Sequence, residues 1–113
     1  MSGNTLLSAF FQSEDTHALV EKARIANSLA KMASGQSREL LYSQKISLLC
    51  RAIEMTPADF VFSYYDERGL IGVRYAPTSE GFHLPAAHLT AGARAAVIES
   101  LMRFLSSSAK AVA

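Results

Sequence analysis

Residues 60–75 read Phe-Val-Phe-Ser-Tyr-Tyr-Asp-Glu-Arg-Gly-Leu-Ile-Gly-Val-Arg-Tyr, and this stretch decides the fold. Two apolar, aromatic-rich segments flank a short charged segment that ends in glycine, which is typical of a β-hairpin. If Tyr65 pairs with Leu70, every second position shares one face of the hairpin. One face is then apolar throughout, with the pairs Phe60 and Tyr75, Phe62 and Val73, and Tyr64 and Ile71. The other face is mixed, so we expect a core on one side of the hairpin only.

A third strand follows the hairpin. The segment 76–81 is rich in turn residues, and Phe82-His83-Leu84 resumes the alternation of apolar and polar side chains. With Tyr75 opposite Phe82, the apolar face gains Phe82 and Leu84, and His83 lies beside Arg74 on the mixed face. Pro85 is expected to end the strand, because proline donates no hydrogen bond to a sheet. Residues 60–85 are therefore predicted to form a three-stranded antiparallel β-meander.

Helices are predicted on both sides of the meander. Ser13 is followed by two acidic residues and an alanine-rich helical pattern up to Gly35, so we expect a helix that begins there and packs on another helix. Ser37 is expected to cap a second helix that ends near Met55, and residues 56–59 to form one further turn. Thr90 is expected to cap a last helix. Its predicted core stripe consists of Val97, Ile98, Leu101, Met102, Phe104 and Leu105.

This order of elements predicts an α+β fold. We expect a two-layer domain with two N-terminal helices, the three-stranded antiparallel meander and a C-terminal helix, the helices covering the apolar face of the sheet. The covered side chains are predicted to be Phe60, Phe62, Tyr64, Ile71, Val73, Tyr75, Phe82 and Leu84.

Length and composition bound the organisation of the chain. Its 113 residues are half apolar, with 11 basic against 10 acidic side chains, and are expected to form a single domain over 1–113. Residues 1–12 are expected to be a flexible or interface segment, and residues 106–113 a frayed tail. The sequence shows neither a secretory signal nor a membrane span, which predicts a cytoplasmic protein without membrane contact.

Residue patterns for chemistry are weak. Cys50 lies at the edge of an apolar stripe without a histidine at a helpful spacing, which favours a buried structural thiol. His83 and His88 lack the further ligands that a metal site needs, and Asp66 and Glu67 fit a solvated turn. We therefore predict no catalytic residue, no metal and no cofactor, and a non-enzymatic protein.

Surface character gives two candidate binding surfaces. The mixed face of the meander is expected to form a small platform that could hold a partner, a second copy of the chain or a stacked base. A plain solvated sheet face is the alternative. The platform consists of Ser63, Tyr65, Gly72, Arg74 and His83. The second candidate is an N-terminal contact segment with Leu6, Leu7, Phe10 and Phe11, which dimerisation or the chain's own core would cover.

Three functional hypotheses follow. The leading one is a small protein-interaction module, a homodimeric regulator, adaptor or inhibitor of another protein. The second is a nucleic-acid-associated, DNA-binding regulator that uses Arg38, Lys45 and Arg51 or the basic residues of the last helix. The segment around Pro57 does not continue as a recognition helix, and the near-zero net charge does not favour this class. The third is a small-ligand-binding or enzymatic domain with a pocket near Tyr64, Cys50 and His88.

Overall fold

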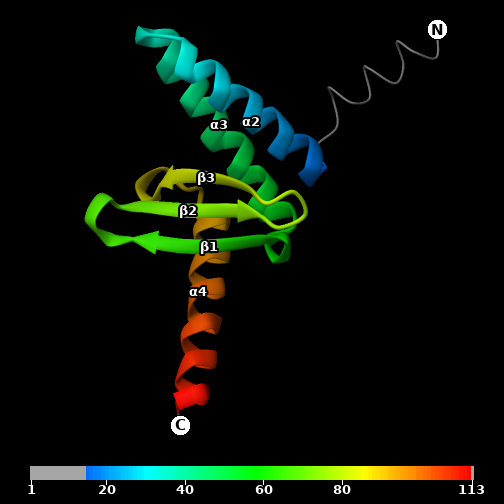
Figure 1. The fold of residues 1–113 in the computed structure, drawn as a ribbon, viewed down its shortest axis with the longest axis vertical. Coiled ribbons are helices and arrows are strands. Elements are labelled where there is room, and N and C mark those ends of the chain that lie inside the picture. The colour runs from blue at the N-terminus through cyan, green and yellow to red at the C-terminus, as the bar shows by residue number, and fades with distance from the viewer. Residues whose placement is uncertain (1–14, 113) are drawn as a thin grey trace, which may run out of the picture. The chain divides into compact units, whose positions relative to one another are not determined.

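A computed structural model describes residues 15–112, except for the side chains of Asp66 and of residues 108–112. Its helices and strands follow the predicted order, two helices, a three-stranded antiparallel sheet and a C-terminal helix, so the predicted α+β class is confirmed (Figure 1). The chain divides into two compact units, residues 1–55 and 56–113. That division does not test the number of domains, and the single domain stays a prediction.

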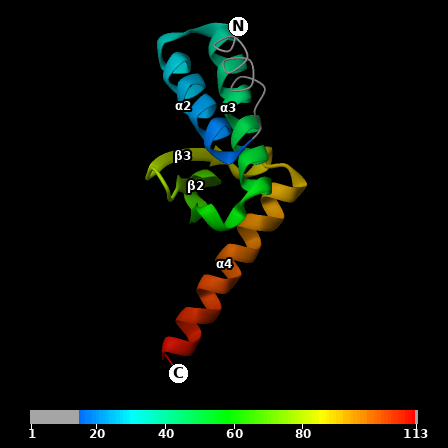
Figure 2. The same ribbon diagram turned by 90° about the vertical axis from the view of Figure 1, so that its right-hand side faces the viewer.

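The first unit is a helical hairpin of α2 (Thr16–Met32) and α3 (Gly35–Met55), which pack along each other (Figures 1 and 2). The predicted cap of α2, Ser13, lies outside the described residues. Asp15, predicted for the first turn, is itself the N-cap and accepts a hydrogen bond from the Ala18 N–H at 2.8 Å. This is the usual arrangement at a helix start, where a short carboxylate satisfies one of the free N–H groups.

The contact between α2 and α3 uses the alanine-rich face predicted for a helix–helix interface. Ala23, Ala26 and Ala30 are buried there, which confirms the prediction. Gly35 has a φ of +60°, a conformation that glycine adopts readily, and α3 begins at this residue rather than after Ser37. The Arg38 Nε donates to the Ala30 carbonyl at 3.1 Å and so satisfies a carbonyl near the end of α2.

The second unit contains the meander, with β1 (Phe60–Tyr65), β2 (Leu70–Tyr75) and β3 (Glu80–Pro85) in that spatial order. The register of β1 and β2 is the predicted one, since Tyr65 pairs with Leu70 and Phe60 with Tyr75. A 3₁₀ turn over Pro57–Asp59 precedes β1, as expected. The buried side chains of the sheet are Phe60, Phe62, Ile71, Val73, Tyr75, Phe82 and Leu84.

The predicted register of β3 is wrong by two residues. Tyr75 pairs with Glu80, and Phe82 lies opposite Val73. The reason is a tight turn in which the Ser79 N–H donates to the Tyr75 carbonyl at 2.8 Å, so that the strand resumes at once. A shift of two residues preserves the faces of a strand, and for this reason Phe82 and Leu84 are still buried.

The last helix, α4 (Ala91–Val112), packs against β1. The Thr90 hydroxyl accepts a hydrogen bond from the Ala93 N–H at 3.3 Å, which confirms the predicted cap. The beginning of α4 crosses the sheet, whereas its C-terminal half extends past it (Figure 2). Fraying of residues 106–113 stays a prediction. None of the described helices combines the length and the apolar character needed to cross a membrane.

Candidate interaction surface

The two halves of α4 lie in different environments. Ala93 and Val97 in the first half are buried under the sheet, but most of the apolar side chains after them are exposed. The predicted core stripe is therefore wrong beyond Val97, with Leu101 half-buried as an intermediate case. The exposed fractions are 51% for Ile98, 62% for Met102, 67% for Phe104 and 65% for Leu105.

The lengths of the elements explain this exposure. A helix of 22 residues is about 33 Å long at 1.5 Å per residue. Three strands about 4.8 Å apart make a sheet only about 10 Å wide between its outer strands. A helix that crosses such a sheet can bury two or three turns, and the remainder extends into solvent. The predicted element lengths in the sequence already carried this signal.

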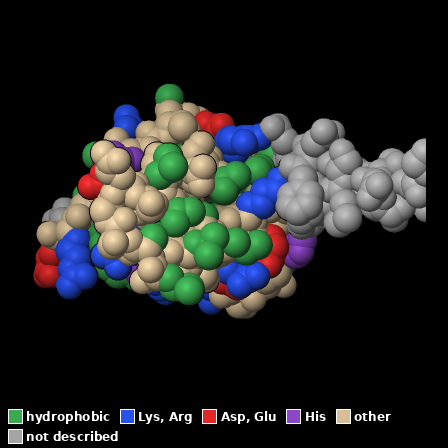
Figure 3. Space-filling view, turned by 90° about the horizontal axis from the view of Figure 1, so that it is seen from above, with side chains coloured by type: hydrophobic (Ala, Val, Ile, Leu, Met, Phe, Trp, Pro, Cys, Tyr) green, Lys and Arg blue, Asp and Glu red, His purple; other side chains and the backbone are tan. Residues whose placement is uncertain are grey.

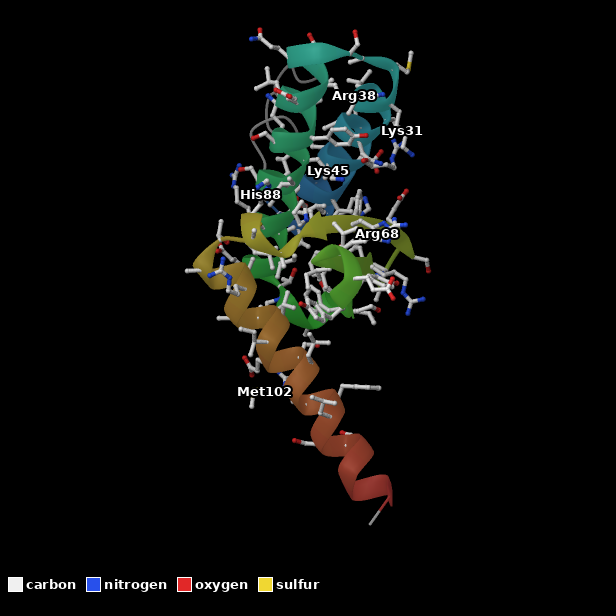
Figure 4. The ribbon with its side chains drawn as sticks, turned by 90° about the vertical axis from the view of Figure 1, so that its left-hand side faces the viewer. Lys31, Arg38, Lys45, Arg68, His88 and Met102 are labelled. Atoms are coloured by element: carbon white, nitrogen blue, oxygen red, sulfur yellow. The ribbon has the colours of Figure 1, made fainter. Side chains whose placement is uncertain are left out.

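The exposed part of α4 is amphipathic. Ile98, Leu101, Met102 and Leu105 recur at spacings of three and four residues and share one side of the helix. Glu99 and Arg103 form an ion pair at 2.7 Å, and two serines follow on the polar side. Figure 4 shows Met102 on the part of α4 that has left the sheet. We call the exposed residues Ile98, Met102, Phe104 and Leu105, together with the half-buried Leu101, the α4 stripe.

An apolar groove lies where α4 leaves the sheet. Tyr64, predicted to be covered, is 53% exposed, because its side chain lines this open groove. The groove has a volume of about 300 Å³, and Arg94 at its edge donates to the Leu89 carbonyl at 3.4 Å. Its lining is Tyr64, Ile71, Ala86, Leu89, Arg94, Val97, Ile98 and Leu101. Because two of these residues belong to the α4 stripe, the groove and the stripe form one continuous apolar surface.

The mixed face of the sheet brings the predicted platform together. Ser63, Gly72 and His83 form one rung across the three strands, and Arg74 lies one rung further along the same exposed face. The Tyr65 ring leans over Gly72, where an added Cβ would come within 2.9 Å of it, and lies 5.8 Å from the His83 ring. A shallow hollow runs along this face. The role of these residues in binding stays a prediction.

Two of the basic residues considered for nucleic acid, Lys45 and Arg38, make contacts within the first unit. Lys45 is only 8% exposed, its Nζ lies 3.3 Å from Asn27 Oδ1 and 5.1 Å from the centre of the Tyr42 ring, and Figure 4 places it between α2 and α3. Burial, with a smaller contribution from Lys31, lowers the pKa of Lys45. Arg38 bonds the end of α2. Lys45 is therefore largely covered within the helical hairpin, and nucleic-acid binding stays a prediction.

The outer surface of the helical hairpin is also partly apolar. Figure 3 looks down on this unit and shows hydrophobic side chains between charged ones. Ile25, Leu29 and Met32 of α2 and Leu40 of α3 are each at least 45% exposed. These four exposed side chains are a second apolar feature of the described surface, besides the α4 stripe.

Cys50 is fully buried, as expected of a structural thiol. Among the described residues, no three histidine, cysteine, aspartate or glutamate side chains are placed to share a metal ion. A ligand pocket near Tyr64, Cys50 and His88 stays a prediction. The predicted contact segment of Leu6, Leu7, Phe10 and Phe11 lies outside the described residues.

Comparison with protein-family models, with curated proteins and with solved structures finds no match to this chain.

Proposed function

We propose that this chain is a small, non-enzymatic protein-interaction module in the cytoplasm, a regulator, adaptor or inhibitor that acts by binding protein through α4. The supporting observation is the α4 stripe. Three of its residues, Met102, Phe104 and Leu105, are more than 60% exposed on a regular helix whose other side is polar. A contiguous apolar surface with a polar border is a mark of protein-binding sites.

The energetics favour a covered stripe. Complete burial of a large apolar side chain contributes about 1.5–3 kcal/mol, so each half-exposed residue of the stripe would contribute roughly half of that range when a partner covers it. Four such residues supply a few kcal/mol from this chain alone. Amphipathic helices bind protein grooves or other helices in this way, with anchors at spacings of three and four residues. Exposure without a partner would instead leave this surface prone to non-specific association.

The test is site-specific photocrosslinking in the native host. Met102 is replaced by photoreactive benzoylphenylalanine, and ultraviolet light is expected to join the chain to protein at this position. Arg103, the next residue but on the polar side of α4, carries the same group as the matched control and should give at most a trace of adduct. Ser63 carries it in a third variant that reports on the sheet platform.

The positions of the adducts distinguish the possible binding surfaces. Protein adducts at Met102 but not at Arg103 support the proposed function. Adducts confined to Ser63 would move the binding site to the mixed sheet face and contradict the role of α4. Equal yields at Met102 and Arg103, or protein adducts at none of the positions, would contradict an interaction module altogether.

A further inference from the structure

We infer that the occupant of the α4 stripe is a second copy of this chain, and that two α4 helices pair antiparallel about a two-fold axis near Arg103. The inference deepens the proposed function and rests on it. The surface that would be covered consists of Ile98, Leu101, Met102 and Leu105 together with the groove beside Tyr64.

The spacing of the stripe is that of a helix pair. Ile98, Leu101 and Leu105 follow the alternation of three and four residues that places side chains on the seam between two helices. Met102 and Phe104 flank this seam on its two sides. The positions that point away from such a seam are polar from Glu99 onward, namely Glu99, Ser100, Arg103, Ser106 and Ser107. The exposed half of α4 thus has the pattern of one partner in a two-helix interface.

A charged residue determines the direction of pairing. Arg94 is four residues before Ile98 and takes the preceding seam position. In a parallel pair, seam positions face their own copies, so two Arg94 guanidinium groups would be brought together at the interface. In an antiparallel pair centred near Arg103, Arg94 lies level with residue 112 of the second copy. The two Arg94 residues are then about 27 Å apart along the helix axis at 1.5 Å per residue.

The same arrangement makes the surface self-complementary, as a two-fold interface requires. Leu101 of one copy would pair with Leu105 of the other, and this pair occurs twice. Since Leu101 also lines the groove beside Tyr64, the free half of the second α4 would lie along that groove. The sheet of each copy, joined at the beginning of its own α4, would then lie at opposite ends of the helix pair.

Overall charge does not oppose self-association. The formal net charge of the chain is +1, so two copies repel each other little. On the exposed half of α4, Glu99 and Arg103 pair within the helix at 2.7 Å and face away from the seam. The seam itself carries no charge between Ile98 and Leu105.

The first measurement is sedimentation equilibrium of the full chain from about 1 µM to about 1 mM, with circular dichroism to verify folding. The wild type should show a monomer–dimer equilibrium. Leu105→Glu should raise the dissociation constant at least about 100-fold, because it places two carboxylates in the seam. Ser106→Glu adds the same charge to the polar side and should change the constant less than about threefold.

The second measurement determines the direction. A nitroxide label on Ala95→Cys reads the distance between copies, and the buried Cys50 is protected from the reagent. An antiparallel pair separates the two labels by about 24 Å along the axis, whereas a parallel pair brings them within roughly 10–15 Å. A double electron–electron resonance distance near 25–30 Å supports the inference, and a distance below about 15 Å overturns the antiparallel arrangement.

The remaining outcomes separate this inference from the proposed function. A wild type that is monomeric at 1 mM, a higher oligomer, or equal effects of Leu105→Glu and Ser106→Glu would overturn pairing with a second copy. Dimerisation that appears only after removal of residues 2–12 would show that this segment is the occupant and would also overturn it. In each of these cases, protein adducts at Met102 in the photocrosslinking experiment would still uphold an interaction module.

Discussion

Helices α3 and α4 are opposite exceptions to the usual distribution of side chains in a folded protein. Helix α3 has a buried charged side chain, and helix α4 has exposed apolar side chains. In α3, Lys45 is 8% exposed, inside the helical hairpin. In α4, Met102, Phe104 and Leu105 are more than 60% exposed. Each arrangement costs free energy unless a partner group compensates it.

The difference between the two lies in where the compensation is found. Lys45 has its partners within the first unit, the Asn27 amide oxygen at 3.3 Å and the Tyr42 ring at 5.1 Å. The α4 stripe, in contrast, is exposed over consecutive turns. An exception with internal partners is a structural feature of the fold, and an exception without them indicates a binding surface.

The largest expected effect compares one substitution in the two halves of α4. Val97→Asp places a carboxylate where the wild-type side chain is 3% exposed, and should reduce the free energy of unfolding by about 3–5 kcal/mol. Leu105→Asp puts the same group on an exposed turn and should change monomer stability by less than about 0.5 kcal/mol. Urea unfolding at a protein concentration of about 1 µM measures both.

Val97→Ala is the control for the buried half of α4. Val97→Ala removes volume without adding charge and should give an intermediate loss, because only packing is lost. If Leu105→Asp destabilised the monomer as much as Val97→Asp, the stripe would have to be covered by the chain itself, and the contrast between the two halves of α4 would be mistaken.

A smaller effect is expected at Lys45. Asn27→Ala removes the acceptor of the buried ammonium group and should cost about 1 kcal/mol, near the low end for a buried group left unpaired, because Asn27 is half-buried and water can replace it. Lys45→Met keeps the length of the side chain without the charge and should be neutral or slightly stabilising. Thermal and urea unfolding of both variants measure these changes.

The double variant decides whether Asn27 acts through Lys45. Without the ammonium group, Asn27→Ala should cost much less than it does in the wild type, which a double-mutant cycle shows directly. Ser28→Ala, an exposed substitution on the same helix, is the matched control and should have little effect. Additive costs for Asn27 and Lys45 would mean that the Asn27 amide oxygen does not compensate the Lys45 charge.

The parts of the structure that the sequence predicts are those set by local periodicity. The pairing of Tyr65 with Leu70 follows from a hairpin in which opposed residues match. The register of β3 could not be predicted in the same way. Glu80 and Phe82 point to the same face, so a shift of two residues leaves the alternation of buried and exposed side chains unchanged. Thr90 could be predicted as a cap since capping depends on neighbouring residues only.

The parts that sequence periodicity could not predict depend on what covers a surface. Ile98, Met102 and Leu105 continue the helical apolar pattern that includes the buried Val97. Such a pattern indicates which side of a helix is apolar, but not whether another element covers that side. Whether that side meets the sheet depends on the helix length relative to the sheet width. Lys45 is a similar case. A lysine within a helical pattern is expected to face solvent, and its burial can be inferred only when the position of the neighbouring helix is known. Local pattern is informative in the sheet and the N-terminal segment, and for this reason the sequence predicts candidate surfaces there and none on α4.

The smallest effect is a pH dependence at Lys45. Burial disfavours its charged form, so its pKa in the folded state lies below the ordinary value of 10.5. Between these two values the unfolded chain binds more protons than the folded one, and the free energy of unfolding therefore rises with pH. The cost of the buried charge is complete below the lowered pKa and disappears as the pH rises past 10.5. Because other groups titrate in the same range, the quantity to measure is the stability difference between wild type and Lys45→Met. This difference should shift toward the wild type as the pH increases from 7 to about 10.5, and a difference that stays constant would show that Lys45 is as well solvated in the hairpin as in the unfolded chain.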